Sequence, residues 1–384
     1  MKVLKNCRFI PELMEGYEGT SGDVLVKDDR ILKITECADE YPEDVEVYDM
    51  GGKYALPGFF DMHIHLSLSG GDTLIDNAKT PVQQALDAVK FAQDSLMAGF
   101  TTLRDVGSYF NVAVELRDAI NAGKIVGPNI IASGKIVTPT ENGNDFFAGL
   151  YNEADGPDEI RKAVREEMKN GADFIKIMGT GAVMNPGGEP GQPIYSLEEL
   201  KAVVEAAKFK DTYVATHCHG TRAIKNSILD DEAIEMLKGN ENTYIIPTLN
   251  IISGLVESVP ESSTFMMAKA KRILECIKVG IRKAYDAGLL LGFGTDQGAT
   301  PLKHGENGDE FALRKEFWDM KEIDIIKQAT INSAIIAGRD KDYGTIKAGK
   351  VADIVGVEGN PLEDISRLRN HVEVVVKSGS VVKG

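Results

Sequence analysis

The central part of the chain alternates short apolar runs with amphipathic helical patterns, and this rhythm limits the folds that it can adopt. Helical patterns cover residues 80–98, 158–170 and 197–209, and apolar runs of strand type lie between them. Strands that alternate with helices form parallel sheets, because a parallel connection has to cross the sheet through a helix. The pattern predicts an α/β fold, a (β/α)8 barrel of the TIM type, with functional groups at the carboxyl ends of its strands.

The two ends of the chain have a different texture from the centre. Short strand-type runs separated by turn residues lie near both termini, at residues 24–27, 30–34, 45–48, 352–357 and 372–376. We therefore expect one small β-sandwich domain formed by both termini, from residues 1–56 and 345–384. The barrel would occupy residues 57–344.

The composition excludes several classes of partner. The net charge is −16, so the surface would repel nucleic acid and anionic membranes. No apolar stretch is long enough to span a bilayer, and the N-terminus lacks the apolar core of a signal peptide. The four cysteines are scattered and form no Cys-x-x-Cys pair, which argues against a disulfide framework or a cysteine zinc site. We expect a cytoplasmic protein.

Two histidines stand at the end of a predicted strand. His63 and His65 close the apolar run 55–62, and only six histidines occur in 384 residues. Residues two apart in a strand point to the same side, so both imidazoles can reach one metal ion. The alternative is a pair of histidines on a solvated strand face. Met62 and Ile64 would be buried on the opposite side, which favours the metal ligands.

Two further strand-type runs carry a charged residue. Lys176 lies inside the apolar run 172–178, where an unpaired ammonium is costly. A carbamate made from CO2 and the neutral amine would be an anion that can bridge two metal ions. The alternative is a lysine that reaches solvent or an acidic partner. Asp296 ends the run 289–296, either as a structural cap or as a metal ligand and general base for a bound water.

Six segments spread over nearly the whole chain resemble the amidohydrolase superfamily. They are Pro-Gly-Phe-Phe-Asp-Met-His-Ile-His at 57–65, Gly-Phe-Thr-Thr-Leu-Arg-Asp at 99–105, Phe-Ile-Lys-Ile-Met at 174–178, Thr-His-Cys-His-Gly at 216–220, Gly-Thr-Asp at 294–296 and Gly-Thr-Ile-Lys-Ala-Gly-Lys-Val-Ala-Asp-Ile-Val at 344–355. Within that superfamily, the chain looks most like the metal-dependent prolidase-like dipeptidases. Those enzymes cleave Xaa-Pro or Xaa-Arg peptides and are related to imidazolonepropionase.

The resemblance implies a hydrolase that cleaves amide bonds of small substrates, above all dipeptides or N-acyl amino acids. It implies two divalent ions, expected to be Zn²⁺. His63, His65, Asp296 and a carbamylated Lys176 would hold one ion, and Lys176 and His217 would hold the other together with a further histidine. Asp296 would take the proton of the attacking water and deliver it to the leaving amine. We also expect a homo-oligomer. A dipeptidase must bind the free carboxylate of its substrate. The candidates for contacts with the substrate are Arg104 (unless it pairs with its acidic neighbour), His219, Arg222 and His304.

One strand of the expected barrel has no counterpart in the sequence. The run 212–217 is followed by two helical patterns, 221–228 and 229–237, without a strand between them. In the resembled family, a strand at this place ends in the fourth metal-binding histidine. Either the sequence omits a stretch between the two helices, or the chain lacks it and holds the second metal poorly. We favour an omission, because an open barrel would leave ladder hydrogen bonds unpaired. His219 could replace the lost ligand, but we prefer a role at the substrate.

Two other functions stay open. One is a cyclic-amide hydrolase or deaminase of the imidazolonepropionase type, and the other is a catalytically inactive barrel that serves as a scaffold. Metal content separates them, because a scaffold would contain no stoichiometric zinc and a mononuclear, deaminase-like site would contain about one ion.

Overall fold

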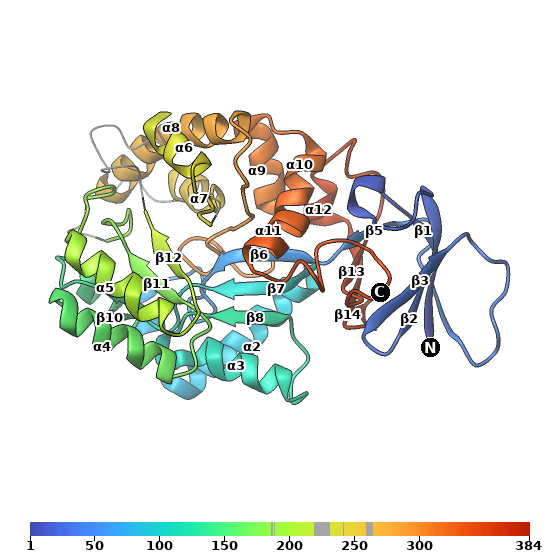
Figure 1. Cartoon of the computed structure of the whole chain (residues 1–384), viewed down its shortest axis with the longest axis horizontal. Coiled ribbons are helices and arrows are strands. Elements are labelled where there is room, and N and C mark those ends of the chain that lie inside the picture. The colour runs from blue at the N-terminus through green and yellow to red at the C-terminus, as the bar shows by residue number, and fades with distance from the viewer. Residues whose placement is uncertain (186, 188, 219–230, 241, 259–263) are drawn as a thin grey trace.

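The computed structural model describes the chain apart from residues 186, 188, 219–230, 241 and 259–263 (Figure 1). Both termini lie at one end of the molecule, in a sheet, and the parallel strands with their helices form the other end. In the described part of the chain, no helix is both long and apolar enough to cross a membrane.

One eight-stranded sheet joins the two ends of the chain. Its order is β15-β14-β13-β5-β1-β2-β3, with β4 beside β1. Its strands are β1 (Lys2–Arg8), β2 (Ser21–Lys27), β3 (Arg30–Thr35), β4 (Glu46–Asp49), β5 (Tyr54–Pro57), β13 (Ile354–Val357), β14 (Val372–Lys377) and β15 (Ser380–Lys383). Apolar side chains from both ends share one core, among them Leu4, Val24, Ile354 and Val374. The expected terminal strands are confirmed, whereas the division into two domains stays a prediction.

Strand β5 continues almost directly into β6 (Phe59–Ile64), the first strand outside the terminal sheet, and only Gly58 separates them. The amide of Gly58 donates to the carbonyl of Asp353 at 2.8 Å, within the terminal sheet. A Cβ atom at position 58 would lie 2.1 Å from Oγ1 of Thr101, so only glycine fits between the two sheets. The strand that carries the two histidines therefore starts from a fixed point.

The parallel strands form two groups. Strands β6, β7 (Phe100–Asp105) and β8 (Asn129–Ala132) form one sheet, and the other has the order β10-β9-β11-β12. The second group consists of β9 (Ile136–Thr138), β10 (Tyr151–Glu153), β11 (Ile175–Met178) and β12 (Val214–His217). The amide of Asp173 donates to the carbonyl of Ala132 at 2.7 Å and links the two groups. Residues at the carboxyl ends of β6, β11 and β12 line one cavity.

The predicted helices are confirmed at 80–98, 158–170 and 197–209, as α2 (Pro81–Met97), α4 (Gly156–Lys169) and α5 (Leu197–Lys208). Helices α2 and α5 begin with capping boxes, which satisfy their first amides. In Figure 1, α2 to α5 lie on one side of the parallel strands and α6 to α10 on the other. The remaining helices are α1 (Thr73–Asn77), α3 (Val112–Asn121), α6 (Asp231–Lys238), α7 (Asn250–Ser258), α8 (Thr264–Asp286), α9 (Asp309–Trp318), α10 (Glu322–Lys327), α11 (Ser333–Ile336) and α12 (Arg367–Asn370).

The strand expected over residues 289–296 is wrong as a regular element. This segment is extended, but Leu291 makes only an isolated bridge to Ile245. It still follows β6, because the amide of Asp296 donates to the carbonyl of His63 at 2.7 Å. Asp296 adopts a left-handed backbone with φ 63°, and beyond it the amide of His65 donates to the carbonyl of Gln297 at 2.9 Å. A Cβ atom on Gly294 would lie 2.9 Å from Cβ of His63, so the segment approaches β6 closely through a glycine.

The strand pairing does not establish a closed eightfold barrel. Among the described residues, β12 pairs with β11 alone, and its side chains are partly exposed although those of β11 are all buried. The expected gap between the two helical patterns falls at residues 228 and 229, outside the described part of the chain. The (β/α)8 architecture stays a prediction.

A buried ion pair in α9 fixes the start of α7. Glu310 and Arg314 are 0% exposed and lie 2.8 Å apart. Glu310 accepts hydrogen bonds from the amides of Leu249 and Asn250 at 3.0 and 2.8 Å. Arg314 donates to the carbonyl of Gly292 at 2.9 Å. One pair of charges thus satisfies backbone groups of two segments that approach the strand ends.

Candidate active site

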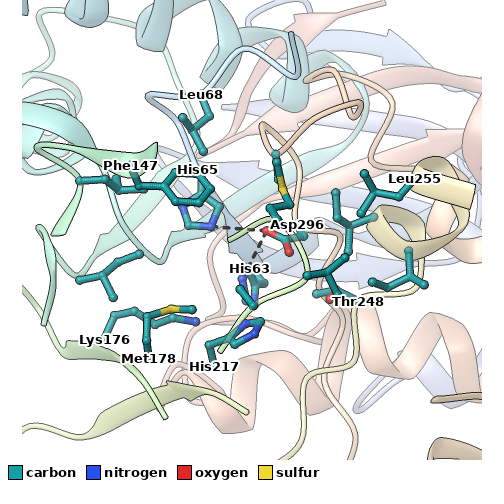
Figure 2. Close-up of a pocket in the computed structure, with 18 of the residues that line it drawn as sticks. His63, His65, Leu68, Phe147, Lys176, Met178, His217, Thr248, Leu255 and Asp296 are labelled. Atoms are coloured by element: carbon teal, nitrogen blue, oxygen red, sulfur yellow. Dashed lines mark ion pairs between the residues drawn. The ribbon is translucent and has the colours of Figure 1, made fainter. Parts of the chain in front are cut away.

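A cavity at the carboxyl ends of the parallel strands brings together five of the predicted site residues (Figure 2). His63 lies on β6, Lys176 on β11 and His217 at the end of β12. His65 follows β6 directly, and Asp296 lies on the extended segment beside it. Residues far apart in the sequence meet because parallel strands place their carboxyl ends on one side of a sheet.

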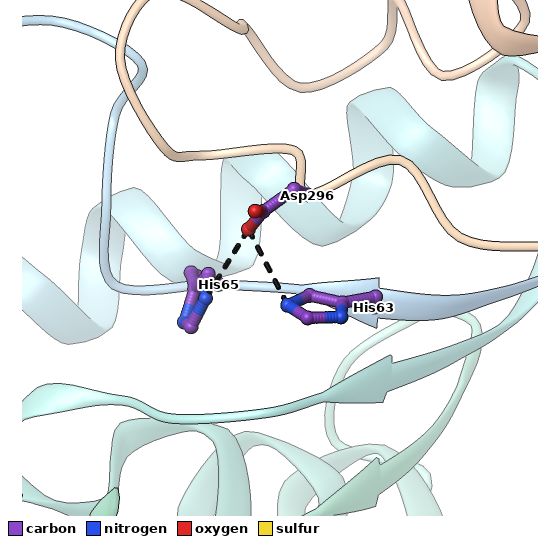
Figure 3. Close-up of side chains that lie close together, drawn as sticks. All are labelled: His63, His65 and Asp296. Carbon is purple, nitrogen blue, oxygen red and sulfur yellow. Dashed lines mark ion pairs between the residues drawn. The ribbon is translucent and has the colours of Figure 1, made fainter. Parts of the chain in front are cut away.

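Three of these side chains form a group that could hold a metal ion (Figure 3). Nε2 of His63 lies 3.5 Å and Nε2 of His65 lies 3.4 Å from Oδ1 of Asp296. One ligand atom from each residue lies within 4.8 Å of the others. An ion between them can reach all three at ordinary metal–ligand distances of about 2.0–2.2 Å.

The proton positions on His65 suit metal binding. Its Nδ1 lies 2.9 Å from the carbonyl oxygen of Gly107, which can only accept, so Nδ1 carries the proton. Nε2 then faces Asp296. Burial alone would lower the pKa of His65, but the hydrogen bond and the negative charge of Asp296 raise that pKa. A metal ion bound at Nε2 would therefore displace a proton. A hydrogen bond of this kind fixes the ring of a metal-binding histidine.

Asp296 is held as a carboxylate. Burial alone would raise the pKa of Asp296, but the neighbouring His63 and His65 outweigh burial and hold that pKa well below the usual range. Its side chain is 17% exposed, within reach of the cavity. The backbone conformation with φ 63° is uncommon for a residue other than glycine and turns this carboxylate towards the histidines.

Asp61 lies beneath the strand ends and supports the group formed by His63, His65 and Asp296. Its role was not predicted from the sequence. It is fully buried and accepts from Oγ1 of Thr295 at 2.6 Å and from Nδ2 of Asn307 at 2.8 Å. Burial raises the pKa of Asp61 to about 6, although these donors oppose the rise. The signal was an acid inside an apolar run, two residues before His63. Asp61 ties β6 to the residue that precedes Asp296.

Lys176 lies inside the cavity wall and is 3% exposed. Burial lowers the pKa of Lys176 to about 8, with Asp296 opposing and Arg104 reinforcing the change. A neutral amine is therefore within easy reach near neutral pH. This is the state that can react with CO2.

The two predicted substrate contacts that the structure describes, His304 and Arg104, do not line the cavity. His304 is buried behind the cavity, with Nε2 2.9 Å from the carbonyl oxygen of Leu68 and its ring stacked on Phe91, and it does not belong to the cavity lining. Arg104 donates to the carbonyl of Met62 at 2.7 Å. Its acidic neighbour Asp105 accepts from the amide of Leu66 at 2.7 Å, and Arg104 does not belong to the cavity lining. His219 and Arg222 lie outside the described residues.

Two apolar walls form much of the rest of the lining, which also includes Ala182, Val183, Met184 and Thr248. We call the first the aromatic wall, formed by Leu68, Ile136, Phe147, Leu150, Tyr151 and Met178. We call the second the aliphatic wall, formed by Ile251, Ile252, Leu255, Ile277 and Ala299. In Figure 2, Phe147 and Leu68 lie on one side of the metal-binding group, and Leu255 lies on the other.

The comparisons with known proteins agree with this geometry. Residues 54–382 match the amidohydrolase family. The chain belongs to this family, and it is therefore a hydrolase that acts on amide-type C–N bonds. Members of the family use metal ions and act on small molecules, which fits the His-His-Asp group.

Several relatives match over most of their length. The chain is 30% identical to ochratoxinase of Aspergillus niger over 377 residues, which cover 86% of this chain and 75% of the relative. It is 25% identical to imidazolonepropionase of Thermoanaerobacter pseudethanolicus over 428 residues, 98% of this chain and 94% of the relative. A solved structure of a Xaa-Pro dipeptidase with methionine in its active site has a TM-score of 0.88 and 32% identity, and the match covers 100% of both chains.

Proposed function

We propose that the protein is a zinc-dependent amidohydrolase of small substrates, most of all dipeptides (Xaa-Pro or Xaa-Arg) or N-acyl amino acids. The observation that carries the proposal is the meeting of His63, His65 and Asp296 in a cavity that Lys176 and His217 also line. Similarity to a Xaa-Pro dipeptidase and to ochratoxinase supports amide substrates. We further propose that the enzyme is cytoplasmic and homo-oligomeric. Its fold would be a (β/α)8 barrel with a small domain formed by both termini.

The donor types of the residues present suit divalent ions, and two ions are part of the proposal. Nitrogen and carboxylate oxygen are the usual zinc donors, and the bond from His65 Nδ1 to Gly107 leaves Nε2 as the nitrogen that faces Asp296. His63, His65, Asp296 and Lys176 would hold one ion, and Lys176 and His217 would contribute to the second. Addition of the neutral Lys176 amine to CO2 forms a C–N bond and releases one proton, which leaves the bridging carbamate. Bound ions would acidify a water and polarise the scissile carbonyl.

The chain's own groups then move the proton. Asp296 is held as a carboxylate, so it accepts a proton from the attacking water and passes it to the nitrogen of the leaving amine as the C–N bond breaks. Asp61 positions Thr295, the residue before Asp296, by accepting a hydrogen bond from its Oγ1. The two apolar walls exclude bulk water from this transfer.

The test combines metal analysis with a substrate panel. Zinc-loaded protein is incubated with dipeptides, N-acyl amino acids and cyclic amides, and released amines are quantified. The proposal expects about two zinc ions per chain and hydrolysis of linear amides. Turnover of cyclic amides alone, with about one zinc, would favour the imidazolonepropionase-type reaction. Absence of both zinc and turnover would favour a scaffold.

A further inference from the structure

The aromatic wall is a built surface on one side of the catalytic group. Phe147, which closes a short helical turn, packs against Tyr151 with ring centroids 5.6 Å apart. Phe146 stands perpendicular to Phe147 at 5.0 Å. Leu68, Ile136, Leu150 and Met178 belong to the same buried cluster. This packing presents a large, firm apolar face to the cavity.

The aliphatic wall belongs to a different part of the core. Ile251, Ile252 and Leu255 come from α7, whose start is fixed by the buried Glu310. Ile277 comes from α8, which packs along α7. In Figure 2, Leu255 lies on the far side of Asp296 from Phe147. The site therefore has one apolar face on each side of the reacting centre.

Charged groups are scarce in this cavity. Among the described residues that line it, Asp296 is the only carboxylate, Lys176 is the only ammonium and no arginine is present. Asp296 already faces His63 and His65. A charged side chain placed against either wall would lose its hydration without gaining a counter-charge, which is costly.

We propose that the site selects amides that carry a bulky apolar group on each side of the scissile C–N bond and rejects substrates with a cationic side chain. This inference rests on the proposed function and narrows its substrate class. Within that class, it favours apolar N-acyl amino acids over Xaa-Arg dipeptides. One wall receives the acyl group and the other receives the side chain on the amine.

The experiment uses zinc-loaded full-length protein and two matched series of amides. The acyl series is N-acetyl-, N-hexanoyl- and N-benzoyl-leucine, and the amine series is N-benzoyl-glycine, -leucine, -phenylalanine and -arginine. The value of kcat/KM should rise at least about tenfold along the acyl series and from glycine to phenylalanine. N-benzoyl-arginine should be at least about a hundredfold slower than N-benzoyl-phenylalanine.

The two proposals can fail separately. If N-benzoyl-arginine or N-acetyl-leucine is hydrolysed as fast as the bulky apolar substrates, the substrate class is wrong and the amidohydrolase function stands. If no amide of these series and no dipeptide is hydrolysed by protein that retains its zinc, the proposed function fails, and the substrate class fails with it.

Two variants test the assignment of the walls. Phe147→Ala should reduce the selectivity of one series at least about fivefold, and Leu255→Ala should do the same for the other series. Leu274→Ala is the matched control, because Leu274 is buried on α8 but does not line the cavity. It should change neither selectivity by more than about twofold. If both wall variants change the same series, or neither changes any, the two-sided arrangement is wrong. Should a variant unfold, the wild-type ratios still decide the proposal.

Discussion

Single hydrogen bonds prepare the side chains of this site for their chemistry. The bond from His65 Nδ1 to the carbonyl of Gly107 leaves the opposite nitrogen available, and Asp61 holds the backbone that precedes Asp296. Burial also contributes, because it lowers the pKa of Lys176 and so favours its neutral amine. The chemistry at the strand ends thus depends on contacts just beneath them.

Lys176→Ala should abolish metal loading and activity, because it removes the group proposed to bridge the two ions. Short carboxylic acids such as acetate or propionate, added to the variant, should restore part of both by supplying the missing anion. Metal content by mass spectrometry and turnover are the measurements. Lys162→Ala, on the exposed surface of α4 at 77% side-chain exposure, is the control and should change neither. Full metal content in the Lys176 variant would disprove the bridging role.

Asp296→Asn should fold normally and retain some metal, but lose at least roughly a hundredfold in kcat, because an amide cannot accept the water's proton. Circular dichroism, metal analysis and steady-state kinetics measure the three quantities. Asp118→Asn is the control, since this carboxylate is 60% exposed beside Arg117. Near-normal turnover of the Asp296 variant would show that another group moves the proton.

At the scale of elements, α9 and the residue that follows it contain two ion pairs with the same spacing and opposite surroundings. Glu310 and Arg314 are fully buried, whereas Lys315 and Asp319 are 38% and 85% exposed. The buried pair satisfies backbone groups at the start of α7, so it also supports the aliphatic wall. The exposed pair lies at the surface, near the end of the helix.

Arg314→Met should lower the free energy of unfolding by about 3–5 kcal/mol, because it leaves the Glu310 carboxylate buried without its partner. Lys315→Met removes the partner of Asp319 and of Glu322 near the helix surface and should cost less than about 1 kcal/mol. Urea denaturation of the two variants and the wild type measures the difference. Equal losses of unfolding free energy in the two variants would contradict the stabilising role of the buried Glu310–Arg314 pair.

The sequence predicted the helices and strand ends well because their signals are local. The residues that cap α2 lie within a few positions of each other, and so do the apolar residues that recur along α5. Contacts between distant segments were missed, such as those from Asp61 to Thr295 and from Glu310 to Leu249, because no local pattern encodes them. The regular strand expected up to Asp296 is wrong for a related reason. The left-handed backbone of Asp296 occurs beside a contact with His63 on β6, which no local pattern encodes.

At the scale of the whole molecule, the N-terminal segment is tied to the chain that follows the parallel strands. Met14 forms a parallel bridge with Ile346. Glu15 accepts from Oγ1 of Thr345 and from Nζ of Lys347, each at 2.6 Å. These contacts close the terminal sheet across more than 300 positions of sequence. They also make part of the stability depend on pH.

Lys347 and Thr345 lower the pKa of Glu15 to about 2, whereas a glutamate in the unfolded chain has a pKa of about 4.3. The carboxylate therefore stabilises the fold above about pH 4.3, and this contribution is lost as the pH falls towards 2. Glu15→Gln should lower the free energy of unfolding at pH 7 by less than about 1 kcal/mol, because the pair is partly exposed. The difference should shrink below pH 4. Urea titrations at several pH values, with the exposed Glu12→Gln as control, would contradict this if the loss were independent of pH.

The passage from β5 to β6 through Gly58 has a consequence for recombination between relatives. A chimera that takes its terminal sheet from one parent and its parallel strands from another would be joined at this glycine. One inserted or deleted residue between the Asp353 contact and β6 would turn both histidines away from the cavity, because strand side chains alternate. Crossovers placed inside the terminal sheet, with β5 and β6 kept from one parent, preserve the catalytic register.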